Sequence, residues 1–162
     1  MRPNHEIPQE PAAGDADALA ALIRISALAN DALMRGEIGL YTSLIRISED
    51  FVLMSPFGGA PSRGPDYTPD RIAAMGRFFR NGTLTQELVE GWATRDMAVF
   101  ATIERTRVEV GGLPLQDWAL RVTQVYRRSG RGWALVHRHA DPLCHGISLE
   151  TSAALGRGAW SV

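Results

Sequence analysis

The stretch Trp-Ala-Leu-Val-His-Arg-His-Ala-Asp-Pro at residues 133–142 has the alternating pattern of a β-strand. Every second side chain of a strand lies on the same face, which here brings together Trp133, Leu135, His137, His139 and Asp141. Two imidazoles and one carboxylate therefore share a face with large apolar side chains. Such a face indicates either the wall of a pocket or a buried hydrogen-bond network.

Three more extended stretches precede this segment, at residues 83–92, 97–110 and 115–128. Short turn sequences separate the four stretches: Arg95-Asp96, Gly111-Gly112 and residues 129–132. A further turn is expected at Asn81-Gly82, ahead of the first stretch. The pattern predicts an antiparallel meander of long strands.

Apolar residues at helical spacing dominate the first part of the chain. Asp15 or Asp17 can cap a helix that Gly36 ends, and a short helix is expected at residues 37–44. Residues 50–55 are expected to be extended, and Thr68-Pro69-Asp70 is a typical helix start. Helices followed by a meander predict an α+β domain in which the helices cover one face of the sheet.

The turns also predict a strand register and therefore the two faces of the sheet. A two-residue turn at Gly111-Gly112 pairs Val110 with Leu113, and the next turn pairs Arg128 with Trp133. The face toward the helices then carries the expected core residues Trp118, Trp133 and Leu135, together with Gln124, His137, His139 and Asp141. The opposite face carries Glu104, Arg121 and small or β-branched side chains: Ala119, Thr123, Val125, Val136 and Ala140. A single β-bulge would exchange part of this assignment.

This arrangement resembles the NTF2-like superfamily, in particular its SnoaL-like and ketosteroid-isomerase-like proteins. The resemblance covers about residues 17–143, and the segments that carry it are residues 50–59, 104–106, 120–123 and 133–141. It implies a cone of about three N-terminal helices packed on a curved antiparallel sheet, with an apolar cavity between them and frequent homodimers. It does not imply one activity, because a single fold hosts many chemistries. The expected organisation is a flexible tail at 1–14, the domain at 15–145 and a C-terminal tail at 146–162.

Composition argues against several classes of function. The 162 residues include 17 basic and 18 acidic side chains, a formal net charge of -1, so nucleic acid is not an expected partner. No apolar run approaches the roughly 18 to 20 residues that span a bilayer, so no membrane partner is expected. The N-terminal sequence has no apolar signal-peptide core, so a cytoplasmic location is expected. The single cysteine, Cys144, has no internal disulfide partner.

His139 and Asp141 are the expected catalytic pair. Their Cα atoms lie about 6.6 Å apart in a strand, which lets the carboxylate orient the imidazole as a general base, although a structural network is the alternative. The same pocket is expected to bind substrate through His137, Gln124, Tyr41, Phe57 and Trp92. No metal or other cofactor is expected, because His137 and Asp141 are about 13 Å apart along a strand and cannot ligate one ion.

Two classes of function are consistent with the sequence. One is a metal-free acid–base enzyme of isomerase, cyclase, hydratase or hydrolase type, acting on a small apolar or amphipathic molecule. The other is a non-catalytic small-molecule-binding or dimeric scaffold domain. A homodimer is expected through the face away from the helices, and Glu104 and Arg121 are expected to pair there. If the faces are exchanged, this pair lies in the pocket instead.

Overall fold

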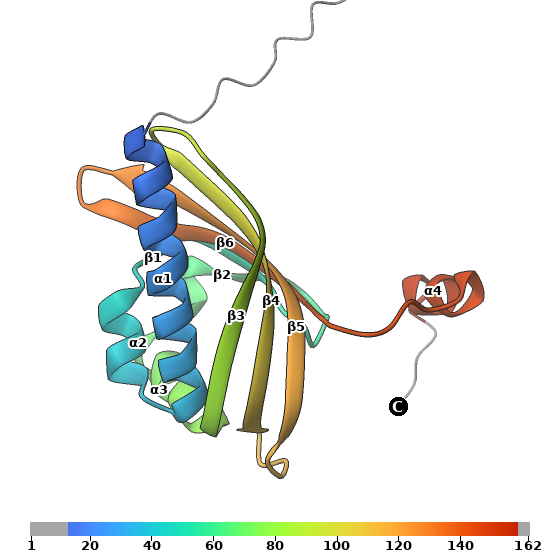
Figure 1. Cartoon of the computed structure of the whole chain (residues 1–162). Coiled ribbons are helices and arrows are strands. Elements are labelled where there is room, and N and C mark those ends of the chain that lie inside the picture. The colour runs from blue at the N-terminus through green and yellow to red at the C-terminus, as the bar shows by residue number, and fades with distance from the viewer. Residues whose placement is uncertain (1–12, 159–162) are drawn as a thin grey trace, which may run out of the picture.

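The computed structural model describes residues 13–158, which form an α+β domain with four α-helices and a curved six-stranded sheet (Figure 1). The helices are α1 (Ala13–Arg35), α2 (Ile38–Leu44), α3 (Pro69–Phe78) and α4 (Leu149–Gly156). The strands are β1 (Ile47–Met54), β2 (Ser62–Arg63), β3 (Phe79–Ala93), β4 (Met97–Val110), β5 (Gln116–Ser129) and β6 (Gly132–Pro142), and Gly64–Asp66 form a 3-10 turn. The predicted fold class and meander are confirmed. Most of the predicted tail at 1–14 lies outside the described residues.

The sheet has the order β2-β1-β6-β5-β4-β3. β1 runs parallel to β6, and every other neighbouring pair is antiparallel. α1 lies along the concave side of the sheet, with α2 and α3 beside its C-terminal end (Figure 1). Its buried residues Leu22, Ala29 and Leu33 share one core with Phe100 and Leu135 of the sheet. This face of the sheet is called the inner face below, and the opposite one the outer face.

The local signals for the helices are confirmed. α1 ends before Gly36, which has a φ of 81° and donates its N–H to the carbonyl of Leu33 at 2.9 Å. The side chain of Thr68 accepts a hydrogen bond from the backbone N–H of Arg71, so it caps α3. α1 starts earlier than expected, and Asp15 lies in its first turn, where the helix dipole favours a carboxylate.

The turn predicted at Asn81-Gly82 is wrong. Both residues lie inside β3, where the pairing with β4 shifts between Arg80 and Thr83. Asn81 takes a φ of 53° in this bulge. A Cβ on Gly82 would lie 2.8 Å from the carbonyl oxygen of Met34, so the glycine allows β3 to pass close under α1.

The predicted register between β4 and β5 is also wrong, by one residue. Thr102 pairs with Val122, whereas the two-residue turn predicted a pairing with Arg121. The loop is longer than predicted because the first residue of β5 is Gln116, which pairs with Val108. Pro114 lies in this loop and has no N–H to donate to a ladder. The slip turns Thr102 and Glu104 to the inner face.

A β-bulge at Val136 shifts the register again within β6. Leu135 pairs with Tyr126 as predicted, but His137 pairs with Val125, so Val136 is an extra residue between them. Beyond the bulge, even-numbered residues face the helices. Of the expected core residues, Leu135 is 1% exposed, while Trp118 and Trp133 are half-buried and pack against the core.

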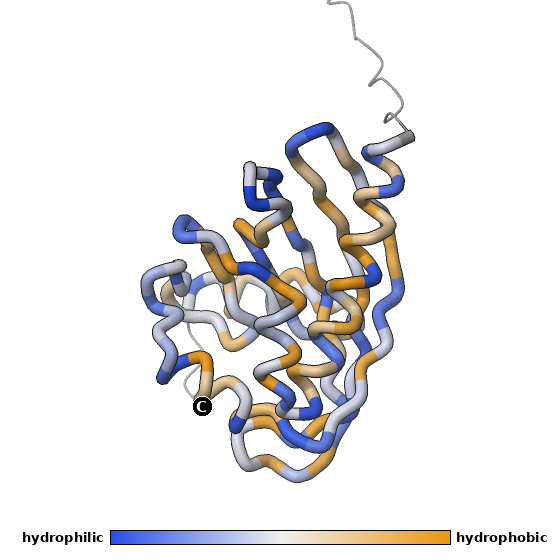
Figure 2. Tube along the Cα trace, turned by 90° about the vertical axis from the view of Figure 1, so that its left-hand side faces the viewer, coloured by the Kyte–Doolittle hydropathy of each residue, from blue (hydrophilic) through white to orange (hydrophobic). Residues whose placement is uncertain are grey.

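Apolar residues follow the strands and the inner helix, whereas several hairpin ends are hydrophilic (Figure 2). α4, within the predicted C-terminal tail, stands away from the sheet beyond the end of β6 (Figure 1). Within residues 13–158, no helix is both long enough and apolar enough to cross a membrane.

Candidate functional site

A cavity of about 440 Å³ lies between the inner face of the sheet and the helices. Its walls are mainly apolar and include Leu33, Met34, Leu53, Met75, Trp118 and Leu135. This volume lies within the range of about 300 to 1,000 Å³ that is typical of small-molecule sites. The cavity is therefore large enough to enclose a small organic molecule.

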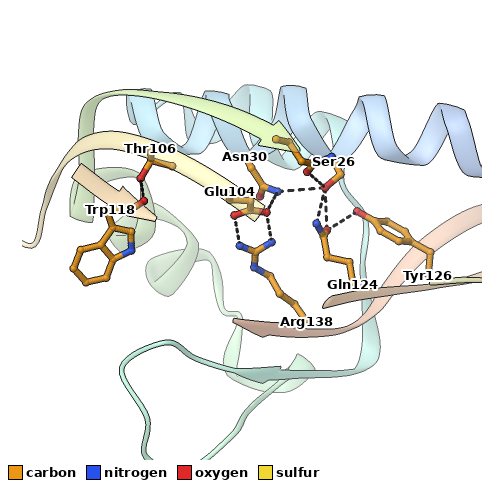
Figure 3. Close-up of polar contacts among 9 residues, drawn as sticks. Ser26, Asn30, Glu104, Thr106, Trp118, Gln124, Tyr126 and Arg138 are labelled. Carbon is orange, nitrogen blue, oxygen red and sulfur yellow. Dashed lines mark hydrogen bonds and ion pairs between the residues drawn. The ribbon is translucent and has the colours of Figure 1, made fainter. Parts of the chain in front are cut away.

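An ion pair between Glu104 of β4 and Arg138 of β6 forms part of the cavity wall (Figure 3). The pairing is bidentate, with Nη1 of Arg138 2.9 Å from Oε1 of Glu104 and Nη2 2.6 Å from Oε2. The Glu104 side chain is 2% exposed and that of Arg138 is 16% exposed. Because a buried charge is costly without a partner, the two groups depend on each other to remain on the inner face.

A chain of neutral polar side chains extends from this ion pair along α1 (Figure 3). The amide of Asn30 donates to Oε1 of Glu104 at 3.2 Å and to the hydroxyl of Ser26 at 3.3 Å. Ser26 accepts a bond from Gln124 at 2.8 Å, and the hydroxyl of Tyr126 donates to Gln124 at 3.3 Å. Every member is buried and hydrogen-bonded, so the chain fixes the orientation of the carboxylate from behind.

Two tyrosines add neutral hydroxyl groups to the cavity wall. Burial raises the pKa of Tyr41 to about 12, with a smaller opposing effect from the nearby charge of Arg138. Burial also raises the pKa of Tyr67. Both phenols are protonated near pH 7, so each can donate a hydrogen bond to an oxygen atom of a bound molecule.

The mouth of the cavity is formed by the exposed residues that line it: Phe57, Gly58, Ala60, Arg71, Ala74 and Phe78. The ring of Phe57 lies 5.8 Å from that of Phe78 and 5.7 Å from that of Trp118. The opening is therefore an aromatic rim with one cationic side chain.

His139 and Asp141 do not line the cavity, so the predicted position of this pair is wrong. The bulge at Val136 places them on the outer face, where their side chains are 42% and 49% exposed. Nε2 of His139 lies 3.5 Å from Oδ2 of Asp141, and Arg121 lies 3.9 Å from the same oxygen. Their catalytic role stays a prediction, now for a site outside the cavity.

Three of the five predicted substrate-binding residues also lie away from the cavity wall. His137 is on the outer face, where Nδ1 lies 2.9 Å from the carbonyl oxygen of Val52. Trp92 is 58% exposed and pairs with Val99 on that same face. Gln124 faces inward as predicted but is buried in the polar chain behind the cavity. Tyr41 and Phe57 do line the cavity.

Arg138 is not among the site residues predicted from the sequence, and Glu104 is predicted in the cavity only for exchanged faces. Glu104 and Arg121 face opposite sides of the sheet, so their predicted pairing is wrong. The pairing of Glu104 with Arg138 can be predicted only if both register shifts are known, the one between β4 and β5 and the one within β6. Among residues 13–158, no group of three or more His, Cys, Asp or Glu side chains is arranged to hold a metal ion.

No protein-family model matches this sequence, and no curated protein matches it either. Several solved structures have a similar architecture. An NTF2-like superfamily protein from Salmonella enterica has a TM-score of 0.67 and 18% identity over 83% of this chain and 97% of its own. A ketosteroid isomerase-like protein from Erwinia carotovora has a TM-score of 0.59 and 18% identity over 80% of this chain and 98% of its own. The association domain of CaMKII from C. elegans has a TM-score of 0.58 and 13% identity over 80% and 99%.

Proposed function

We propose that this chain, which has the NTF2-like fold, binds a small, mostly apolar organic molecule in its cavity. The observation that carries the proposal is an apolar cavity of about 440 Å³ with an ordered polar group, Glu104–Arg138, in its wall. A mainly hydrophobic lining with a few fixed polar groups is typical of small-molecule sites. Both oxygens of Glu104 accept bonds from Arg138, which favours recognition of a ligand over proton abstraction.

Methionine methyl groups provide a test of binding inside the cavity. Met34 and Met75 line the cavity, whereas Met97 is the first residue of β4 and does not line it. We expect titration with decan-1-ol, a neutral apolar probe, to shift the ¹³C-methyl NMR signals of Met34 and Met75 saturably. The signal of Met97 serves as the internal control.

A matched pair of variants adds a test of location. Ala74 lines the mouth of the cavity, while its neighbour Ala73 is exposed and does not line it. Ala74→Trp should weaken decan-1-ol binding by about tenfold, because excluding two methylene groups costs about 1.6 kcal/mol. Ala73→Trp should leave binding unchanged. Equal losses in both variants, or shifts of all methionines together, would contradict the proposal.

Acid–base catalysis on the bound molecule is the second candidate. The observation that favours it is that the carboxylate of Glu104 and the neutral phenol of Tyr41 line one cavity. A base and a hydrogen-bond donor are the groups that proton abstraction next to a carbonyl requires. The test is exchange of the α-protons of a β,γ-unsaturated cyclic ketone in D2O, followed by ¹H NMR. Exchange catalysed by the wild type and lost in Glu104→Gln, at a temperature where circular dichroism shows the variant folded, supports catalysis. His139→Ala shows whether the outer-face pair contributes.

We also propose a homodimer through the outer face of the sheet. Its centre carries half-buried small or β-branched side chains: Val99, Ala101, Ala119, Thr123 and Val125. The face predicted from sequence is wrong for Glu104 and Ala140, which are 2% and 1% exposed on the inner face. A CaMKII association domain shares this fold, which supports association between copies. Sedimentation velocity at micromolar concentration should give a dimer for the wild type and a monomer for Val125→Glu. A monomeric wild type would contradict the proposed dimer.

A further inference from the structure

The positive and negative charges of the residues that line the cavity do not cancel. The charged residues are Arg71, Glu104 and Arg138, two guanidinium groups and one carboxylate. Glu104 is fully engaged by Arg138, through two hydrogen bonds of 2.9 and 2.6 Å. The positive charge of Arg71 is therefore left over at the mouth of an otherwise apolar cavity.

Neutral groups hold Arg71 in the cavity wall. Its Nη2 donates to the hydroxyl of Ser62 at 2.8 Å, and its guanidinium lies 5.2 Å from the ring centroid of Tyr67. Ser62 and Tyr67 both line the cavity. In the described part of the chain, no carboxylate oxygen lies within 4.0 Å of this guanidinium. The nearby carboxylate of Asp66 accepts the backbone N–H of Arg63.

This arrangement leaves the guanidinium positioned but not neutralised. A guanidinium has five N–H donors, of which the bond to Ser62 uses one. Its planar fork suits a carboxylate, which can accept two parallel bonds from it. The aromatic ring of Tyr67 supports one side of the guanidinium and reduces the entropy lost when an anion binds.

We infer that the cavity selects amphipathic monocarboxylates, with the carboxylate paired to Arg71 at the mouth and the apolar body inside. The inference rests on the proposed binding function and names its ligand class. The opposite orientation is unfavourable, because a carboxylate at the deep end would lie beside the buried carboxylate of Glu104 and would lose its hydration. The apolar walls around Met75 and Trp118 fit the alkyl or ring portion of such a molecule.

The test compares decanoate with decan-1-ol, which share a ten-carbon chain and differ in charge. Isothermal titration calorimetry at low salt should show that the wild type binds decanoate more tightly. Arg71→Gln should weaken decanoate by about three- to tenfold, the range of a partly exposed ion pair, and leave decan-1-ol unchanged. Arg71→Lys retains the charge but loses the planar fork, so it should retain only part of the preference. Arg77→Gln is the matched control, because Arg77 is an exposed arginine of the same helix that does not line the cavity.

Each other outcome overturns the inference. Equal binding of the two probes by the wild type removes the selection of anions, while cavity binding itself remains supported. An equal loss of affinity for both probes in Arg71→Gln would show that Arg71 only shapes the mouth of the cavity. Equal losses in Arg71→Gln and Arg77→Gln indicate a general effect of net charge. Failure of both probes to bind removes the proposed function together with this inference.

Discussion

Replacing Glu104 by Gln should destabilise the protein strongly, because it leaves the guanidinium of Arg138 inside the domain without a counter-charge. The Glu104 side chain is 2% exposed, and its carboxylate accepts two short hydrogen bonds that the guanidinium donates. Removing one partner of a buried ion pair costs about 3 to 5 kcal/mol. The Arg138 side chain is 16% exposed and lines the cavity, where water can reach it, so we expect a value near the lower end, about 3 kcal/mol.

Urea unfolding followed by circular dichroism measures this loss. For a slope of about 2 kcal/mol/M, a loss of about 3 kcal/mol lowers the midpoint by about 1.5 M. The control is Asp117→Asn, which removes the exposed pair of Asp117 with Arg107 and should cost less than about 1 kcal/mol. The double variant Glu104→Leu with Arg138→Met should lose less unfolding free energy than the sum of the losses in Glu104→Leu and Arg138→Met alone, since no charge is then left unpaired. A loss below about 1 kcal/mol in Glu104→Gln, or strictly additive losses, would refute the reasoning.

Three further predictions follow from particular contacts. Gly64→Ala should cost about 1 to 3 kcal/mol, because its Cβ would lie 2.2 Å from the carbonyl oxygen of Glu49; an unchanged thermal midpoint would contradict this. Tyr41 should titrate near pH 12, which can be measured as the difference in phenolate absorbance between the wild type and Tyr41→Phe. Its contribution to stability is present below pH 10 and is lost as pH rises from 10 toward 12. A difference that titrates near pH 10 would argue against its burial. The hydrogen bonds from Arg127 lower the pKa of Asp50 from 3.8 to about 2, so the stabilisation by this pair is present above pH 3.8 and is lost as pH falls toward 2. Carboxyl NMR should show the pKa of Asp50 rising in Arg127→Gln, and an unchanged value would exclude this cause.

The helices and strands could be predicted because their signals are local. Gly36 and Thr68 mark helix ends through their own backbone and side-chain chemistry, which needs no information from distant residues. The α+β class followed from the order and length of these elements, whereas the cavity was implied by the resemblance to the NTF2-like superfamily. Tyr41 and Phe57 line the cavity: Tyr41 lies on α2, which begins two residues after Gly36, and Phe57 lies in the loop after β1.

The faces of the strands could not be predicted with equal success, because register depends on contacts between strands. Both faces of β4 carry apolar residues, with Phe100 inward and Val99 outward, so hydrophobic alternation does not select one of them. Pro114 was an available signal that the loop before β5 is long. The bulge in β6 has no comparable local mark, and it alone decides whether Arg138 or His139 reaches the cavity.

The extra residue at Val136 also affects how this chain must be aligned with other proteins. A relative whose strand has no bulge needs one residue fewer to reach the same point of the sheet. An alignment without a gap at Val136 would match His137 and His139 to inward positions of that relative, and Arg138 to an outward one. Functional residues transferred by such an alignment would be assigned to the wrong side of the sheet for the rest of the strand. A one-residue gap at Val136 restores the correspondence and matches Arg138 and Ala140 with the residues that line the relative's interior.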